Sequence, residues 1–217
     1  MNLPFTTAQF FDVFEKYNTQ VWPMQVVLYA LALLVVLFAW RHRQASARSV
    51  MAILAGLWLW MGIVYHFMFF AAINPAANVF GTIFVIQGFI LLYAGIIQPK
   101  LSFRIRMTLT GGTGLVFIAY ALLIYPLIGM VFGHMFPRAP IFGLPCPTTI
   151  FTFGVLLFAN ERVPWYLFVI PLLWSLVGFS AAWTLGVIQD YGLLVAGVLG
   201  SALLLLNNRN EMSTKPD

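Results

Sequence analysis

Long apolar runs, separated by short stretches that hold most of the charged residues, are the feature that most limits what this chain can fold into. Of its 217 residues, 62% are hydrophobic and 8% are charged, whereas about a quarter of the residues in a soluble domain are charged. Water could not wet a surface built from such runs. The composition therefore excludes a soluble enzyme, a disordered chain and a disulfide scaffold, and indicates a protein embedded in lipid.

The lengths of the apolar runs predict helices that cross a membrane. A helix needs about 20 residues to cross ~30 Å of hydrocarbon, and open strands would leave backbone polar groups unpaired in lipid. We expect an all-α bundle of seven transmembrane helices, or six if the short fifth span fails to cross. The expected spans are Val21–Trp40, Ser49–Ile73, Asn78–Ile97, Met107–Leu127, Pro147–Ala159, Val163–Trp183 and Gln189–Leu206.

Basic residues in the loops predict how the bundle is oriented. They gather between the first two spans and between the third and fourth, as Arg41, Arg43, Arg48, Lys100, Arg104 and Arg106. Because positive residues are retained on the cytoplasmic side, the N terminus is expected outside and the C terminus in the cytoplasm. The chain would then comprise an interfacial helix on the outer side (1–20), a transmembrane bundle (21–206) and a short cytoplasmic tail (207–217).

A short amphipathic helix is predicted before the first span. Thr6 and Gln9 have the spacing of a capping box, and Phe5 and Phe10 have that of a hydrophobic staple. Aromatic residues continue at helical spacing, with charged residues on the other side. This pattern favours a helix that lies in the membrane interface. The alternative is a helix that folds down as a lid over a pocket.

The fifth span is interrupted at its start. The run from Pro147 to Ala159 is too short to cross a bilayer alone, so Ile141 to Pro145 is expected to dip into the membrane as non-helical chain. Such backbone is tolerated only where protein or water covers it, and interrupted spans often mark binding sites. Cys146 is thereby placed at the start of a half-helix, where unpaired amides and the helix dipole favour a thiolate. A small buried cysteine without a chemical role is the alternative.

Three ionisable side chains are expected at a similar depth. Counting about 1.5 Å per residue from the cytoplasmic helix ends places His66, Cys146 and Asp190 in the outer third of the membrane. A titratable group there is costly, and it normally faces the bundle interior or a wet cavity. We therefore expect these three residues, with Thr148 and Thr149, to bind a ligand in a polar pocket that opens outward.

A soft or borderline metal ion, Cu or Zn, is one candidate for that ligand. Imidazole and thiolate are suitable ligands for both metals, and His134 lies shortly before the broken span. The expected metal ligands are Cys146, His134 and His66. Their spacing matches no established metal motif, so packing inside the bundle is the alternative for each of them.

Three functions remain open. The first is transport or binding of a small solute or soft metal ion. The second is a membrane-embedded thiol or redox enzyme with Cys146 as the reactive group and His66 as its base, although the lack of a second cysteine counts against it. The third is a non-catalytic accessory or assembly protein. The net charge of +5 forms no patch that could follow phosphates, so the expected partner is the lipid bilayer and not nucleic acid.

Two motifs rich in aromatic residues and proline stand at the N terminus and before the fifth span. The first is Leu3-Pro4-Phe5-Thr6, Gln9-Phe10-Phe11, Phe14, Tyr17-Asn18 and Trp22-Pro23, and the second is Pro145-Cys146-Pro147-Thr148-Thr149 with Thr152-Phe153-Gly154. With these motifs the chain resembles, over nearly its whole length, an uncharacterised bacterial family of small polytopic membrane proteins, known only as a domain of unknown function. The resemblance implies a multi-pass protein of the bacterial inner (cytoplasmic) membrane. It implies no activity and assigns no functional residue.

Overall fold

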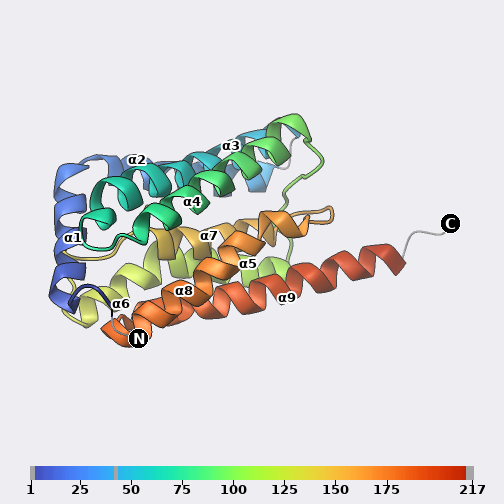
Figure 1. The fold of residues 1–217 in the computed structure, drawn as a ribbon. Helices are drawn as coiled ribbons and strands as arrows, with labels where there is room; N and C mark the ends of the chain where they lie inside the picture. The colour runs from blue at the N-terminus through green and yellow to red at the C-terminus, as the bar shows by residue number, and fades with distance from the viewer. Residues whose placement is uncertain (1–2, 42–43, 214–217) are drawn as a thin grey trace.

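The computed structural model describes residues 3–41 and 44–213, which form a bundle of long helices (Figure 1). Six helical segments are long and apolar enough to cross a membrane. Each lies close to a predicted span, which confirms the expected all-α membrane bundle. Arg43 and the last four residues of the predicted tail lie outside the described residues. The six segments are Met24–Arg41, Ser46–Ala72, Ala77–Ile97, Leu109–Val131, Trp165–Leu185 and Ile188–Asn208.

Several of these segments combine more than one type of helix. The α-helices are α1 (Thr7–Gln20), α2 (Met24–Arg41), α3 (Gln44–Trp60), α4 (Ala77–Leu92), α5 (Leu109–Ala119), α6 (Tyr125–Val131), α7 (Pro145–Leu156), α8 (Val169–Leu185) and α9 (Tyr191–Ser213). The π-helices η1 (Met61–Phe69), η3 (Tyr93–Ile97) and η4 (Tyr120–Ile124) continue α3, α4 and α5 directly. Short 3₁₀-helices are η2 (Phe70–Ala72), η5 (Trp165–Leu167) and η6 (Ile188–Asp190).

The predicted half-helix is α7. It has 12 residues and so rises only about 18 Å at 1.5 Å per residue, too little to cross a bilayer alone. It lies inside the bundle and packs against α5, α8 and α9 (Figure 1). Residues 139–144, which precede it, are non-helical and mostly buried. Protein therefore covers the backbone that the sequence analysis expected to dip into the membrane.

Beyond α7 the chain pairs with the loop that precedes α5. Phe103 and Ala159 form an isolated antiparallel bridge, and the backbone N–H of Arg104 donates to the carbonyl of Phe158 at 2.9 Å. These contacts satisfy backbone groups at a place where α7 has ended. Together with its non-helical flanks, α7 thus forms a seventh passage between the two ends of the bundle (Figure 1).

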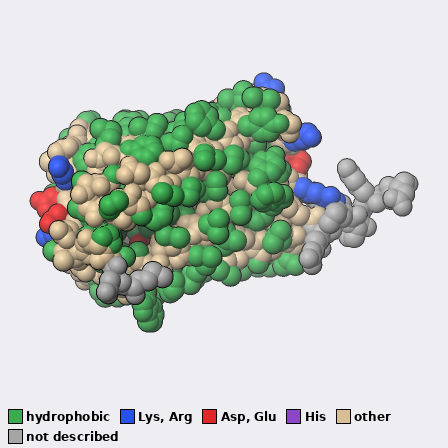
Figure 2. All heavy atoms as spheres, in the orientation of Figure 1, with side chains coloured by type: hydrophobic (Ala, Val, Ile, Leu, Met, Phe, Trp, Pro, Cys, Tyr) green, Lys and Arg blue, Asp and Glu red, His purple; other side chains and the backbone are tan. Residues whose placement is uncertain are grey.

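Charged side chains gather at the two ends of the bundle, and hydrophobic side chains cover the surface between them (Figure 2). One end, called here the α1 end, carries α1 and the loops before α4, α7 and α9. The opposite end carries the loops before α5 and α8 (Figure 1). An apolar belt between two charged ends is the surface expected of a bundle surrounded by lipid.

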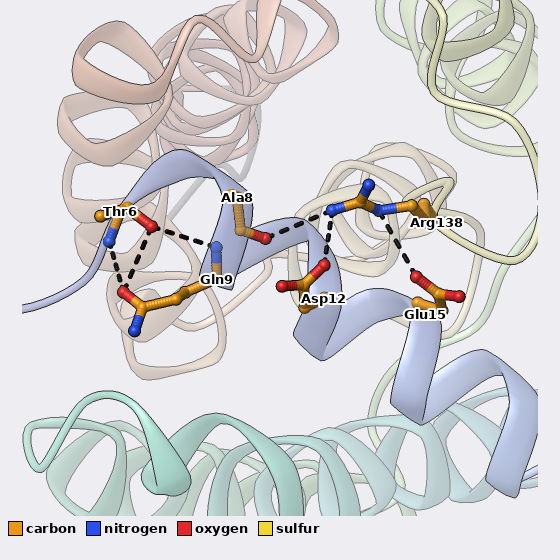
Figure 3. Close-up of polar contacts among 6 residues, drawn as sticks. All are labelled: Thr6, Ala8, Gln9, Asp12, Glu15 and Arg138. Carbon is orange, nitrogen blue, oxygen red and sulfur yellow. Dashed lines mark hydrogen bonds and ion pairs between the residues drawn. The ribbon is translucent and has the colours of Figure 1, made fainter.

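α1 lies across the α1 end, transverse to the long helices (Figure 1). It begins with the predicted capping box. The backbone N–H of Gln9 donates to Thr6 Oγ1 at 3.3 Å, and that of Thr6 donates to Gln9 Oε1 at 2.8 Å (Figure 3). The rings of Phe5 and Phe10 stack at a centroid distance of 5.8 Å. This start is fixed by the local sequence pattern.

Arg138, from the segment before α7, fastens the polar side of α1. Its Nη2 lies 2.5 Å from Asp12 Oδ1 and its Nε lies 3.5 Å from Glu15 Oε2. Nη2 also donates to the carbonyl of Ala8 at 3.4 Å (Figure 3). One guanidinium group therefore holds two turns of α1 against the loop that leads into the half-helix.

The aromatic side of α1 packs on the bundle. Phe11, Phe14 and Tyr17 are buried and share a hydrophobic cluster with Tyr65 and Phe70. This side of α1 therefore faces the interior of the bundle.

Candidate functional site

A cavity of about 270 Å³ lies beneath the N-terminal segment at the α1 end. This volume is near the lower limit for small-molecule pockets. The lining comes from residues 3–14, from η1, η2 and α8, from the turn between α8 and α9, and from the starts of α4, α6 and α7. Most of it is apolar. Its most prominent part, called here the aromatic wall, consists of Phe5, Phe10, Phe14, Tyr65, Phe70, Phe80 and Trp174.

Three lining residues form a polar corner of the cavity: Cys146, Tyr125 and Asp190. The Tyr125 hydroxyl donates to Asp190 Oδ1 at 2.5 Å, and the Cys146 thiol contacts the same carboxyl group. Asp190 is 5% exposed and Tyr125 is 1% exposed. The corner therefore places one carboxyl group and two hydrogen-bond donors in an apolar setting, where polar contacts are strong.

Cys146 owes its position to the start of α7. Leu144 caps the helix with an extended backbone, and the prolines at 145 and 147 occupy its first turn, where proline lacks only an N–H that would be unpaired anyway. The side chain of Cys146 then points toward Asp190 and toward the indole of Trp174. Trp174 Nε1 has no hydrogen-bond acceptor of good geometry among the described residues. The Cys146 sulfur, a weak acceptor, is the polar atom that the indole contacts.

The prolines also limit what the helix start can do electrostatically. Two of the first amides of α7 are absent because they belong to proline, and the N–H of Thr148 donates to the carbonyl of Leu144 at 3.2 Å. From the sequence, several unpaired amides were expected to favour a thiolate at Cys146. That expectation is wrong, because only the amide of Cys146 itself remains and a carboxyl group adjoins the thiol.

Thr148 and Thr149 bind backbone and do not line the cavity. Thr148 Oγ1 accepts a hydrogen bond from the N–H of Gly143 at 3.2 Å, and the Thr149 hydroxyl donates to the carbonyl of Pro145 at 2.8 Å. Both threonines are fully buried. They were expected to bind a ligand, but their hydroxyl groups instead hold the turn that positions Cys146.

Asp190 is placed by the tight connection between α8 and α9. Gly186 ends α8 in the left-handed conformation with φ of 73°, which glycine adopts without steric cost. The N–H of Asp190 donates to the carbonyl of Val187 at 3.1 Å, and the Tyr120 hydroxyl donates to the carbonyl of Gln189 at 2.7 Å. The carboxyl group is thus held on a short 3₁₀ turn beside the start of α6.

Two π-helices adjoin the site. η1 carries Tyr65 of the aromatic wall, and η4 ends directly before Tyr125 of the polar corner. π-helical turns often occur at functional sites because they redirect side chains within an otherwise regular helix. Their position here is an observation independent of the cavity, and it points to the same end of the bundle.

His66 lies outside the cavity. It is fully buried, and its ring packs against Phe84 and Trp174 with centroid distances of 4.7 Å and 5.3 Å. Both of its nitrogens lack a hydrogen-bond partner within the described part of the chain. The structure therefore brings Cys146 and Asp190 together as expected but separates His66 from them. In this arrangement His66 is not the base of a reactive cysteine.

His134 is also separate from the polar corner. Its ring stacks on Phe11 at a centroid distance of 4.0 Å. Burial lowers its pKa below the ordinary 6.5, and the nearby charge of Arg138 adds to the effect. No three His, Cys, Asp or Glu side chains in residues 3–41 and 44–213 are grouped so that they could hold a metal ion. The expected set of Cys146, His134 and His66 is therefore not assembled.

Tyr125, Tyr65 and Trp174 were not expected from the sequence to be part of a site. All three are neutral aromatic residues, and seven tryptophans and eight tyrosines in a membrane protein are ordinarily attributed to packing and interfacial anchoring. One signal was available for Tyr125: a proline follows it directly, and proline inside a span often accompanies a local change of helix geometry.

Comparison with known proteins gives a family without an assigned activity. No curated protein and no solved structure matches the chain. The model of DUF6064, described as a family of unknown function, matches residues 7–215. An uncharacterised family was expected from the sequence, and the match covers the whole bundle together with α1. This membrane-type helical bundle therefore belongs to the DUF6064 family.

Proposed function

We propose that the protein binds a small amphipathic molecule in the cavity at the α1 end, as a step in the uptake or transport of that molecule. The observation that carries the proposal is a carboxyl group that is 5% exposed and faces a mostly apolar cavity. A charged or titratable group inside a membrane protein is costly and is usually retained for a function. The apolar lining would hold the body of the ligand, and the polar corner would bind its single polar group.

The side of the cavity offers a route for such a ligand. Ala76 and Phe80 of the α4 start and Val177 and Ala181 of α8 are lining residues that also reach the surface. Val177 lies eight residues before the end of α8, about 12 Å along the helix, so this opening belongs to the apolar belt. A molecule dissolved in the membrane could therefore enter between α4 and α8, whereas the N-terminal segment and α1 cover the cavity from the end.

The charge distribution supports an orientation with the α1 end outside. Exposed charges at that end balance, with Asp12 and Glu15 against Lys16 and Arg138. Among the side chains that the structure describes, the opposite end carries one acidic residue, Glu161, and six basic ones. Positive residues are retained in the cytoplasm, so the cavity would lie on the outer side of a bacterial inner membrane. The six basic residues are Arg41, Arg48, Lys100, Arg104, Arg106 and Arg162.

The single cysteine of the chain makes the proposal testable without engineering a reporter. Cys146 lines the cavity, so its modification by the small apolar reagent methyl methanethiosulfonate, followed by intact mass spectrometry, reports access to the cavity. We expect Cys146 to react in the folded protein in detergent. Ala181→Phe, which adds a ring at the side opening, should slow the reaction at least tenfold.

Ala30→Phe is the matched control, because Ala30 is exposed on α2 and does not line the cavity. This variant should react like the unaltered protein. If Cys146 of the folded protein fails to react even at alkaline pH, where the thiol ionises, or if Ala181→Phe and Ala30→Phe react at the same rate, the cavity is not an accessible binding site and the proposal is wrong.

A further inference from the structure

We infer that the ligand is an organic cation, an amine or quaternary ammonium with an apolar body. This inference rests on the proposed function and names the chemical class of molecule that the cavity takes. Three features support it: the charge of the polar corner, the nature of the aromatic wall, and the absence of positive charge from the lining.

The carboxyl group of Asp190 has hydrogen-bond donors but no cation. Tyr125 and Cys146 both contact it, and neither carries a positive charge. A carboxyl group buried without a cation favours its neutral form, whereas a cation beside it favours the charged form. A positively charged ligand would supply the missing partner, as the protein itself does not.

The aromatic wall suits a cation better than a neutral chain. Aliphatic side chains would bind a hydrocarbon equally well, but the faces of aromatic rings also attract positive charge through their quadrupoles. Trp174, the residue type that binds cations best, stands beside the polar corner and contacts Cys146. Rings from α1, η1, α4 and α8 approach the cavity from several sides, so that a cation held by Asp190 would lie among them.

The lining also discriminates against anions. It includes no Lys, Arg or His among the described residues, and Asp190 is its one carboxylic acid. An anionic headgroup would lie beside an acidic side chain without any compensating cation, which is unfavourable in an apolar site. The volume of about 270 Å³ corresponds to roughly nine water-sized groups at ~30 Å³ each. This limits the ligand to a small cation.

The test compares two methanethiosulfonate reagents of fixed and opposite charge at Cys146. One carries a trimethylammonium group and the other a sulfonate group. Their ratio of reaction rates is measured on the purified full-length protein in detergent and on N-acetylcysteine amide as a free reference thiol. We expect the ratio of cationic to anionic rate at Cys146 to exceed the reference ratio at least tenfold. Using a ratio cancels any change in the intrinsic reactivity of the thiol.

Variants of Asp190 identify the group responsible. Asp190→Asn should lower the ratio at least tenfold, equivalent to about 1.4 kcal/mol, whereas Asp190→Glu should preserve the preference for the cation. Glu161→Gln removes the same charge at the opposite end of the bundle, where Glu161 accepts hydrogen bonds from Ser102, and should leave the ratio unchanged. If Asp190→Asn does not fold, the rate ratios of the unaltered protein and of Asp190→Glu are compared with the ratio of the reference thiol. A ratio no higher than the reference in both proteins would still overturn the inference.

The outcomes separate this inference from the proposed function. If methyl methanethiosulfonate modifies Cys146 and Ala181→Phe slows it, but the charged reagents show only the reference ratio, the cavity is a binding site and the ligand is not a cation. The same conclusion follows if Asp190→Asn and Glu161→Gln change the ratio equally. If the apolar reagent also fails to reach Cys146, the proposed function fails together with the inference.

Discussion

The hydroxyl of Tyr125 donates a hydrogen bond to Asp190 over 2.5 Å, and this bond joins the start of α6 to the turn that precedes α9. Both residues are buried. The tyrosine follows a π-helix and the aspartate belongs to a 3₁₀-helix. Each partner therefore sits where regular helix is interrupted, so the bond fixes the relative position of two irregular segments as well as the carboxyl group.

Replacing Tyr125 tests the strength of that connection. Tyr125→Phe should lower the free energy of unfolding by about 1–3 kcal/mol, because the buried carboxyl group loses a donor. Thermal unfolding followed by circular dichroism measures the change. Tyr93→Phe is the control, since the Tyr93 hydroxyl accepts a hydrogen bond from Gln98 on the exposed surface and should contribute less than about 0.5 kcal/mol. Equal effects of the two variants would contradict a special role for Tyr125.

Substitution of Arg138 tests whether α1 covers the cavity as a lid. Arg138→Gln removes exposed ion pairs with Asp12 and Glu15, and such pairs contribute at most about 1 kcal/mol. We expect the fold to persist while the modification of Cys146 by methyl methanethiosulfonate becomes a few times faster, since α1 would detach more often. Arg48→Gln, at the opposite end, is the control. An unchanged rate in Arg138→Gln would mean that α1 does not limit the access of the reagent to Cys146.

The spans and the broken helix could be predicted from sequence because they depend on local properties. Apolar runs of sufficient length fix the six long segments, and the prolines around Cys146 predict the start of α7 to within two residues, since Pro147 was expected and α7 begins at Pro145. Counting residues along the helices also placed Cys146 and Asp190 at one level, and the two residues meet. These predictions needed only the rise of a helix and the cost of burying charge.

The same count failed for His66 because the depth of a residue in the membrane does not determine which way its side chain points. His66 belongs to the π-helix η1, in which hydrogen bonds run from i to i+5 and side chains rotate differently along the axis than in an α-helix. The count from Ser49 gave only a depth, and His66 packs against Trp174 of the aromatic wall without lining the cavity itself. The π-helix also turns Tyr65, which was not expected to contribute, toward the cavity.

His66 should accept an apolar replacement. Its two nitrogens have no partner in the described part of the structure, and an unsatisfied buried polar group costs about 1–3 kcal/mol. His66→Leu, which has a similar volume, is expected to leave the melting temperature unchanged or raise it, with the charge selectivity at Cys146 retained. Loss of that selectivity would show that His66 acts in the binding site after all.

Acid should weaken the attachment of α1 through His134. Burial lowers the pKa of His134 in the folded protein below the 6.5 of the unfolded chain, so the unfolded state takes up the proton first as pH falls. Stability contributed by the neutral imidazole is complete above pH 6.5 and is lost progressively below it. The free energy of unfolding of the unaltered protein should therefore decline more steeply between pH 7 and pH 5 than that of His134→Gln. Parallel pH profiles would contradict this assignment.

Gly143 determines how the chain enters the half-helix. Its φ of 97° is unfavourable for any residue with a Cβ, and an added Cβ would lie 2.4 Å from Leu28 Cδ1. Gly143→Ala should therefore cost about 1–3 kcal/mol and displace the turn that Thr148 and Thr149 hold. Because Cys146 follows this turn, the variant should also alter the rate of its modification. Gly112→Ala is the matched control: nothing lies within 4 Å of an added Cβ there, and alanine in place of glycine favours a helix by up to about 1 kcal/mol. If the two substitutions had the same effect on unfolding and on Cys146, the positive φ at Gly143 would not be what positions the thiol beside Asp190.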